Sequence, residues 1–482
     1  GSAIAWQFSD KNRMAKSFAY HYEKGNLLED HVFYCAARGG NFNGNPYAIF
    51  KYLYGNPDYK HLKHVILVDD KQNPRVLPYL GDDRVIVVKT TDYKNYAKYA
   101  QTSKYLIVDS SLTTYYIKKE GQVYVHSWHS TLLKSLGAHT DLIWETHNLA
   151  KSLLDSDFFF SPNRYTSERL FKAYYCDTLY QGKILELGYP RNDLIYHADK
   201  QKIRESLNIP NNKKVVLYAP TWRGTVSKPV NSMDIFFKHY DKISSGLGDE
   251  YTVLIKLHIM SEDCLTDEQI KRVVPFDIET NMLLSITDIL ITDYSGILFD
   301  YMITGNPLIL FPFDEAEYLN HRGGEIDFYL DLNDIPAPIC RTSERVVEAI
   351  NNIDSISQEK MTEYNSFKNR FVGNDDGHAC ERVCDAIFGN KKYESDFTLT
   401  NNASDKKSIL IIFDDLNDFT ITSKFLNFLD KIDYDKYQIT IYLKSIHENR
   451  QMQKKINRNA KIFYKSVRPM CVNFTEWKAI KR

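Results

Sequence analysis

Asp288-Ile-Leu-Ile-Thr-Asp-Tyr-Ser-Gly-Ile-Leu-Phe-Asp-Tyr-Met302 has the pattern of a strand, a polar turn and a helix. The apolar run 289–291 predicts a buried strand, and the apolar positions within 297–302 have helical spacing. The polar turn 292–296 therefore lies at a strand end and at the start of a helix. Backbone N–H groups and the helix dipole favour anions such as phosphate at this place. An ordinary turn, capped by Asp293 or Ser295, is the alternative interpretation.

Strands alternate with helical segments over most of the 482 residues. This alternation predicts an α/β fold with two doubly wound, Rossmann-like domains that face each other across a cleft. The expected strands are short apolar runs at 32–36, 65–68, 85–88, 105–108, 122–126, 214–218, 252–257, 273–275, 289–291 and 308–311.

We expect an N-terminal extension at 1–30, a first domain at 31–190 and a second at 191–392. A polar linker precedes residues 404–482, which begin another α/β pattern. That segment is either the truncated start of a further domain or an appendage docked on the second one. Gly1-Ser2-Ala3 has the composition of a cloning remnant, so the natural N-terminus is expected to be missing.

Composition excludes several classes of function. The 61 basic and 62 acidic residues give a net charge of −1, which argues against a nucleic-acid partner. Seven scattered cysteines favour a reducing compartment, and the isolated group His378, Cys380 and Cys384 does not predict a metal. Neither a Rossmann glycine fingerprint nor a Walker lysine loop occurs, so a nicotinamide cofactor is not expected. No apolar run approaches the ~20 residues of a membrane span.

Polar residues follow three expected strands of the second domain. In Tyr218-Ala-Pro-Thr-Trp-Arg223, Pro220 ends the strand, and Thr221 and Arg223 extend beyond it. Arginine at this position suits bidentate binding of phosphate, although a salt-bridged loop is the alternative. His258 ends the next strand, and 292–296 follow another. Because parallel strands end at one edge of a sheet, the three ends together predict a phosphate site.

His129 lies in a loop between a predicted strand and a helical run. A histidine titrates near neutrality and can take a proton from a hydroxyl nucleophile, while Lys134 in the same loop can hold an anion. A simple loop histidine is the alternative for both His126 and His129. Residues 188–193 lie between the two expected domains and have the composition of a hinge.

Together these segments resemble the CDP-glycerol glycerophosphotransferase family, which makes teichoic acids and related capsule polymers and has a two-domain GT-B fold. The family's Trp-His-Gly-Thr-Pro-Leu-Lys motif is similar to Trp128 to Lys134. Its Gly-Tyr-Pro-Arg-Asn-Asp, Tyr-Ala-Pro-Thr-Trp-Arg, Leu-His, Thr-Asp-Tyr-Ser-Ser and Asp-Gly-x-Ala-x-Glu-Arg motifs are similar to 188–193, 218–223, 257–258, 292–296 and 376–382. The resemblance spans roughly 30–390. Residues 404–482 lie outside it and are more like the opening of a glycosyltransferase-like domain.

The resemblance implies a polyol-phosphate transferase, with CDP-glycerol or CDP-ribitol as donor substrate and no bound cofactor or metal. His129 would be the general base, and His258 would act with Arg223 on the pyrophosphate. The implied donor-binding residues are Tyr218, Pro220, Thr221, Arg223, His258, Thr292, Asp293, Tyr294, Ser295 and Gly296. The implied acceptor-side residues are Ser130, Thr131 and Lys134.

The implied acceptor is a lipid-linked or oligomeric polyol-phosphate or saccharide at the cytoplasmic face of the bacterial cell membrane. Residues 6–16, basic and aromatic, are the candidate for contact with this membrane surface. A homo-oligomer is left open.

The sequence departs from the family motifs at several positions. Ser130 stands where the family has glycine, Leu132 where it has proline, and Gly296 where it has serine, while Ile259 replaces a common proline. These positions border both substrate sites, so the choice between glycerol and ribitol stays open. A GT-B glycosyltransferase that uses a nucleotide sugar, and a non-catalytic homologue that binds polymer, are the alternative functions.

Overall fold

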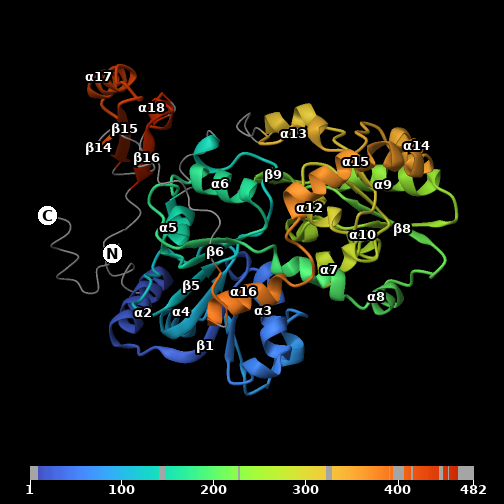
Figure 1. The fold of residues 1–482 in the computed structure, drawn as a ribbon, viewed down its shortest axis with the longest axis horizontal. Helices are drawn as coiled ribbons and strands as arrows, with labels where there is room; N and C mark the ends of the chain where they lie inside the picture. The colour runs from blue at the N-terminus through green and yellow to red at the C-terminus, as the bar shows by residue number, and fades with distance from the viewer. Residues whose placement is uncertain are drawn as a thin grey trace.

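The computed structural model describes residues 9–140, 147–225, 228–321, 328–389, 391–393, 406–413, 416–443, 449–453 and 455–464. Two parallel sheets dominate it (Figure 1). The first has seven strands in the order β3-β2-β1-β4-β5-β6-β7. Its strands are β1 (Leu28–Cys35), β2 (Lys63–Val68), β3 (Val85–Lys89), β4 (Ser103–Val108), β5 (Val123–His126), β6 (Phe158–Ser161) and β7 (Lys183–Glu186).

The second sheet has four parallel strands in the order β11-β8-β12-β13. They are β8 (Lys214–Ala219), β11 (Tyr251–Ile255), β12 (Ile289–Thr292) and β13 (Leu308–Leu310), and a separate antiparallel hairpin joins β9 (Arg223–Thr225) to β10 (Lys228–Val230). In both sheets the strand that comes first in the sequence is internal, so the order in which strands are added reverses beside it. Such a reversal opens a crevice at the carboxyl ends of the strands. The predicted pair of doubly wound, Rossmann-like units is confirmed.

Helices connect the strands and cover the sheets (Figure 1). Those that accompany the two large sheets are α2 (Asp10–Lys24), α3 (Gly44–Gly55), α4 (Tyr93–Thr102), α5 (His147–Asp155), α6 (Arg164–Ala173), α7 (Asp193–His197), α8 (Lys200–Ser206), α9 (Met233–Gly246), α10 (Asp267–Ile270), α11 (Thr280–Leu284), α12 (Ile297–Met302), α13 (Glu315–His321), α14 (Ser343–Asn351), α15 (Ile353–Val372) and α16 (Ala379–Phe388). Of the predicted membrane-contact segment, residues 6–8 lie outside the described residues, and the rest begins α2 after its N-cap Ser9.

The core is continuous between the two sheets. Trp128 and Leu133, which follow β5, belong to the same buried apolar cluster as Tyr294 and Leu298, which follow β12. Burial of apolar surface contributes roughly 25 cal/mol per Å². Separating the sheets at this point would therefore expose apolar side chains as well as break polar contacts.

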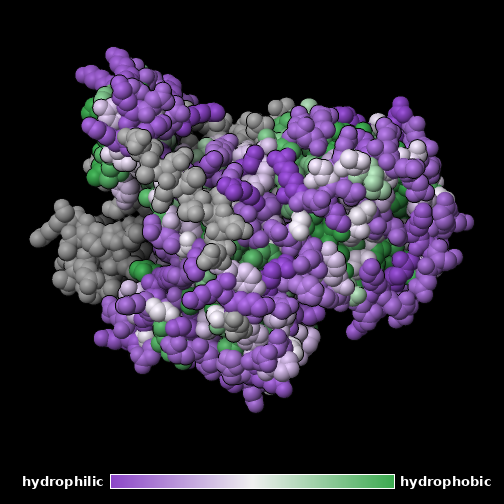
Figure 2. All heavy atoms as spheres, viewed as in Figure 1, coloured by the Kyte–Doolittle hydropathy of each residue, from purple (hydrophilic) through white to green (hydrophobic). Residues whose placement is uncertain are grey.

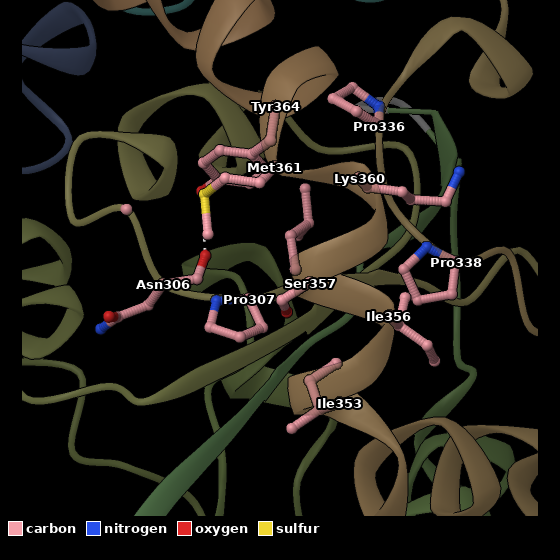
Figure 3. A pocket seen from close by; sticks show the side chains of 12 residues that line it. Asn306, Pro307, Pro336, Pro338, Ile353, Ile356, Ser357, Lys360, Met361 and Tyr364 are labelled. Carbon is pink, nitrogen blue, oxygen red and sulfur yellow. Dashed lines mark hydrogen bonds between the residues drawn. The ribbon is translucent and has the colours of Figure 1, made fainter.

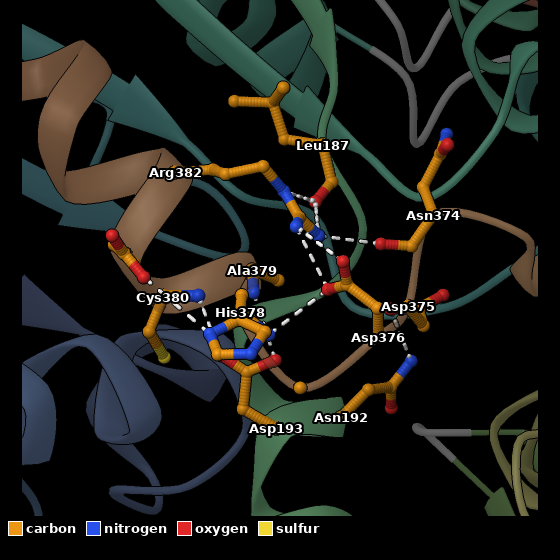
Figure 4. A network of polar contacts seen from close by, with 12 residues as sticks. Leu187, Asn192, Asp193, Asn374, Asp375, Asp376, His378, Ala379, Cys380 and Arg382 are labelled. Atoms are coloured by element: carbon orange, nitrogen blue, oxygen red, sulfur yellow. Dashed lines mark hydrogen bonds and ion pairs between the residues drawn. The ribbon is translucent and has the colours of Figure 1, made fainter. Parts of the chain in front are cut away.

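Two chain crossings connect the sheets, and they bind each other (Figure 4). Arg382 donates to the carbonyl oxygen of Leu187 on the outgoing crossing and to that of Asn374 on the returning one, at 3.0 and 2.6 Å. Gly188 has φ +83°, and a Cβ there would approach the carbonyl oxygen of Asn374 to 2.6 Å. Glycine is therefore required where the crossings touch.

The last helix of this unit returns to the first sheet. Helix α16 packs beside α3, and its Val383 and Ile387 belong to the core of the first sheet (Figure 1). The carboxylate of Asp193, on the outgoing crossing, accepts hydrogen bonds from the backbone N–H groups of Ala379 and Cys380 at 3.0 and 2.6 Å (Figure 4). Asp193 of the outgoing crossing thus caps the N-terminus of α16, the helix that follows the returning crossing.

Residues 406–464 form a third, smaller unit. Its parallel sheet has the order β14-β15-β16, built from β14 (Lys407–Phe413), β15 (Tyr437–Leu443) and β16 (Lys461–Tyr464) with helices α17 (Phe419–Asp430) and α18 (Arg450–Gln453). Lys461 on β16 donates to Thr178 at 3.0 Å, which docks the unit on the first sheet's side of the molecule. At the opposite edge, Leu410 and Ile412 of β14 are 63% and 69% exposed. Figure 2 shows the resulting hydrophobic surface along the left side of this unit.

Asp375 is a buried carboxyl between the crossings (Figure 4). Its Oδ1 accepts from the backbone N–H of Tyr189 at 2.7 Å and from the Asn192 amide at 3.0 Å. Its Oδ2 is buried without a hydrogen-bond partner among the described residues. Burial raises the pKa of Asp375 from 3.8 to about 7, against the opposing effect of these two donors.

Asp375→Asn should remove a pH dependence of stability. The folded state holds the Asp375 proton up to a pKa of about 7, whereas the unfolded chain releases it near 3.8. Stability from this group is therefore fully present below pH ~4 and is lost as the pH rises to ~7, by at most ~4 kcal/mol. Urea unfolding between pH 5 and 8 should show a steeper loss of stability in the wild type than in the variant. The exposed Asp83→Asn variant is the control, and parallel pH profiles for wild type and Asp375→Asn would contradict the expectation.

Candidate active site

His129 lies in the loop after β5. Its Nδ1 is 3.0 Å from the backbone carbonyl oxygen of Asp109, directly after β4. Because a carbonyl oxygen only accepts hydrogen bonds, Nδ1 carries the proton and Nε2 keeps its lone pair. The side chain is exposed to solvent, yet desolvation by the surrounding protein lowers the pKa of His129, with Asp109 opposing this effect. The ring is thus neutral near pH 7 and able to accept a proton.

The backbone before His129 is strained. Trp128 has φ 47°, a left-handed conformation that large side chains rarely adopt. The amide of Asn45, a completely buried residue of α3, donates to the carbonyl oxygens of Ser127 and Trp128, each at 2.9 Å. Helix α3 therefore fixes the turn that presents His129.

Arg191 holds the same turn from the other side. Its guanidinium donates to the carbonyl oxygen of His129 and forms an ion pair with Asp300 of α12 at 2.7 Å. Its backbone N–H donates to Asn45 at 3.1 Å. Burial acts to lower the pKa of Arg191, but Asp300 and other groups outweigh it, so the pKa is raised and the charge is retained. Arg191 thus ties the His129 loop to the helix that follows β12.

Arg223 does not face an open anion site. Its guanidinium is buried and makes ion pairs with Asp293 at 2.9 Å and with Asp314 at 2.6 Å. A third contact goes to the carbonyl oxygen of Thr221. Asp293 in turn accepts from the backbone N–H and the hydroxyl of Thr221 at 2.8 and 2.5 Å, and from the N–H of Tyr294 at 2.6 Å. Asp293 therefore connects Thr221, Arg223 and Tyr294 through its carboxylate. The N-cap residue of α12 is Gly296.

Aromatic rings surround this network and meet the acceptor-side loop. Tyr294 stacks on Tyr318 of α13, with ring centroids 4.0 Å apart. Lys134 donates to the hydroxyl of Tyr318 at 2.9 Å, and it pairs with Phe328 through an antiparallel bridge. The predicted acceptor residue Lys134, which follows β5, is therefore bonded to residues that follow β13 in the second sheet.

Four further predicted residues are buried, and two of them form side-chain hydrogen bonds within the protein. Tyr218 and Pro220 lie in the interior, and Thr292 donates to the carbonyl oxygen of Ala219 at 2.7 Å. The hydroxyl of Thr131 accepts from the Asn163 amide at 3.4 Å. These side chains support the loops from the protein interior. Because they are buried, their positions do not favour direct contact with a substrate.

The predicted residues that retain access to solvent are His129, Ser130, Lys134, His258, Ser295 and Gly296. His258 follows β11, and its ring lies 6.2 Å from that of Trp222, between centroids. Ser295 accepts from the N–H of Ile297 at 3.4 Å. The accessible groups thus come from the loops after β5, β11 and β12.

Sequence reasoning missed several residues that shape this site: Asn45, Asp109, Asp300, Asp314 and Tyr318. Asp109 carried a usable signal, because it directly follows an expected strand. Arg191 lies within 188–193, a segment predicted to be a hinge and similar to a family motif, but Arg191 was not among the predicted site residues. Asp314 and Tyr318 carried no local signal, since the charged groups they bind, Arg223 and Lys134, are 91 and 184 residues away in sequence.

A hollow beside β13 and α15 lies apart from these loops (Figure 3). Pro307, Pro338, Ile353 and Met361 are among the residues that line it, and none of the predicted site residues does so. Among the described residues, no cluster of three potential metal ligands from His, Cys, Asp and Glu occurs. Within the same ranges, no helix combines the length and apolar character needed to cross a bilayer.

The family model described as CDP-Glycerol:Poly(glycerophosphate) glycerophosphotransferase matches residues 17–389. The chain belongs to this family. It is 29% identical over 401 residues to a teichoic acid poly(glycerol phosphate) polymerase of Staphylococcus epidermidis, and 29% identical over 372 residues to one of Bacillus spizizenii. The solved structure of the wall teichoic acid polymerase TagF matches with a TM-score of 0.66 and 25% identity, over 81% of this chain and 95% of that chain. These matches confirm the predicted family and the GT-B fold.

The relatives differ in how much of them the chain covers. The two matches span 78% and 73% of this chain, but 53% of the S. epidermidis protein and 90% of the B. spizizenii protein. A teichoic acid poly(ribitol-phosphate) polymerase of B. spizizenii is 33% identical over 219 residues, which is 42% of this chain and 33% of that protein. The matches therefore include relatives named for glycerol phosphate and a relative named for ribitol phosphate.

Arg223→Ala should destabilise the fold. Removing the guanidinium leaves Asp293 and Asp314 close together and without their buried counter-ion, a change that typically costs ~3–5 kcal/mol. Chemical unfolding monitored by circular dichroism would measure the loss. Arg345→Ala is the matched control, because Arg345 pairs with Glu348 on the surface and should change stability by less than ~1 kcal/mol. Equal stability of the Arg223→Ala variant and the control would contradict a structural role.

Proposed function

We propose that the chain transfers glycerol phosphate or ribitol phosphate from a CDP-activated donor to the hydroxyl end of a teichoic-acid-like or capsule polymer. The observation that carries this proposal is the state of His129: its proton is held on Nδ1 by the Asp109 carbonyl, and its exposed ring is neutral. A general base for a hydroxyl nucleophile needs this arrangement. TagF, the structural relative, has also been solved as a histidine-to-asparagine variant with CDPG.

In the proposed reaction, Nε2 of His129 takes the proton of the terminal acceptor hydroxyl. The freed oxygen attacks the β-phosphorus of the CDP-polyol, and the bond from that phosphorus to the bridging oxygen breaks, so CMP leaves. Catalysis then depends on positioning and on stabilising charge. Exposed His258 and the accessible edge at Ser295 and Gly296 are the candidates for contact with the diphosphate.

We assign Arg223 a structural role instead of the phosphate binding that the resemblance implies. Its charge is already matched by two carboxylates, so it holds the loops that carry Thr221 and Asp293 instead of the phosphates. Lys134 similarly holds Tyr318. Both are positioning residues.

We assign the acceptor side to residues 31–190 and the donor side to 191–392. The acceptor would be lipid-linked or oligomeric, and the protein would work peripherally at the cytoplasmic face of the bacterial membrane, without a bound cofactor. A glycosyltransferase that uses a nucleotide sugar is the competing function. CMP release from CDP-glycerol or CDP-ribitol with an oligomeric acceptor, compared with UDP release from UDP-sugars, tests the choice. UDP release alone would overturn the proposal, and no release of either nucleotide would favour a non-catalytic homologue.

His129→Ala should lower kcat for CMP release by ~10²–10⁴-fold, because the acceptor hydroxyl loses its proton acceptor. Binding of CDP-glycerol, measured by calorimetry, should change little. His61→Ala, at an exposed histidine after α3, is the matched control and should keep wild-type activity. A fully active His129→Ala protein would exclude the assignment.

A shortened chain ending at residue 402 should retain CMP release, because β14–β16 contribute no residue to the loops around His129. Removing this unit also removes the exposed apolar edge at Leu410 and Ile412, which should reduce self-association. Gel filtration and circular dichroism would verify that the shortened chain is folded. A folded chain that releases no CMP would show that residues 404–482 take part in the site.

A further inference from the structure

Ser130 and Gly296 compete for one space between the two sheets. Ser130 lies next to His129 in the loop after β5, and Gly296 is the N-cap of α12. A Cβ placed on Gly296 would collide with Oγ of Ser130. The same Cβ would lie 3.3 Å from the carbonyl oxygen of Thr131 and 3.4 Å from Cβ of Ser130. The space therefore has room for one side chain.

Backbone conformation does not explain the glycine. Gly296 has φ −65° and ψ −9°, which any residue adopts. Its lack of a side chain matters because Oγ of Ser130 occupies the place of a Cβ, beside the carbonyl oxygen of Thr131. The Ser130 hydroxyl is itself held there, since it donates to the carbonyl oxygen of Thr131 at 3.0 Å. Rotating it away would break this hydrogen bond.

The two positions are also the places where the sequence departs from the family motifs in opposite directions. The motifs have glycine where this chain has Ser130, and serine where it has Gly296. Contact between the two positions turns two separate departures into one reciprocal exchange.

We propose that Ser130 and Gly296 form an exclusive pair that sets the spacing between the His129 loop and the loop after β12. This inference rests on the proposed function, because it assigns the pair a positioning role between the general base and the donor diphosphate. With both side chains present, the loops are pushed apart. With neither present, the spacing is no longer defined.

The experiment is a double-mutant cycle with Gly296→Ser, Ser130→Gly and the combined variant Ser130→Gly/Gly296→Ser. Gly296→Ser should lower kcat/KM for CMP release on the order of tenfold or more, because small displacements of reacting groups are costly. The effect should fall mainly on kcat. The combined variant should recover to within about threefold of wild type, since neighbouring residues are not additive.

Gly55→Ser is the matched control, because a Cβ at Gly55 meets nothing within 4 Å. It should leave activity unchanged. Equal activity of Gly296→Ser and wild type, or a combined variant as impaired as Gly296→Ser alone, would overturn the exclusive pair.

Thermal unfolding separates this inference from the proposed function, since it needs no substrate. Gly296→Ser should lower Tm by about 2 °C or more, and the combined variant should restore it. A wild-type protein that releases no CMP, but shows this restoration of Tm, would refute the proposed function and leave the steric pair intact. Additive Tm changes would refute the pair whatever the activity.

Discussion

The guanidinium of Arg191 is the point at which the two halves of the molecule depend on each other. It comes from the outgoing crossing, contacts the backbone carbonyl of His129 and pairs with Asp300 of α12. A buried cation is costly unless carboxylates and hydrogen bonds compensate it. Here the partners come from opposite sheets, so the charge is satisfied only when the sheets have this relative position. The strained turn at Trp128 is held by the same set of contacts, through Asn45.

Arg191 and Arg223, which follow β7 and β8, serve different purposes. Arg223 carries one positive charge among two carboxylates, so the local sum is negative and a diphosphate would be repelled. Its value lies in rigidity: Asp293 binds Thr221 and Tyr294, and Asp314 accepts from the Tyr294 hydroxyl at 3.2 Å. This rigid loop places Gly296 against Ser130.

The fold was predictable because its signals are local. The run 289–291 and the helical spacing after it correspond to β12 and α12. The expected strand 273–275 is wrong for a local reason as well: Val274 donates to the carbonyl oxygen of Ile255 at 2.9 Å, but no ladder continues past this contact. The partners of Arg223 and Lys134 were not predictable, since an arginine after a strand looks the same whether it meets a phosphate or a distant aspartate. The sequence placed these residues at the correct edge of the sheet, and the structure distinguishes those that are accessible from those that are bonded within the protein.

Polar and apolar contacts between the sheets have different consequences for movement. The buried ion pair Arg75–Glu279, at 3.1 Å, joins residues that flank the two sheets. An ion pair of this kind can exchange its partner for water when the surfaces separate, so it does not by itself prevent opening. The apolar cluster shared by Trp128 and Tyr294 cannot make that exchange. Separating the sheets at this cluster would therefore expose its apolar side chains to water. His129, Ser130 and Gly296 lie close in sequence to members of this cluster, Trp128, Leu132 and Leu298, so packing of the cluster supports the positions of both loops.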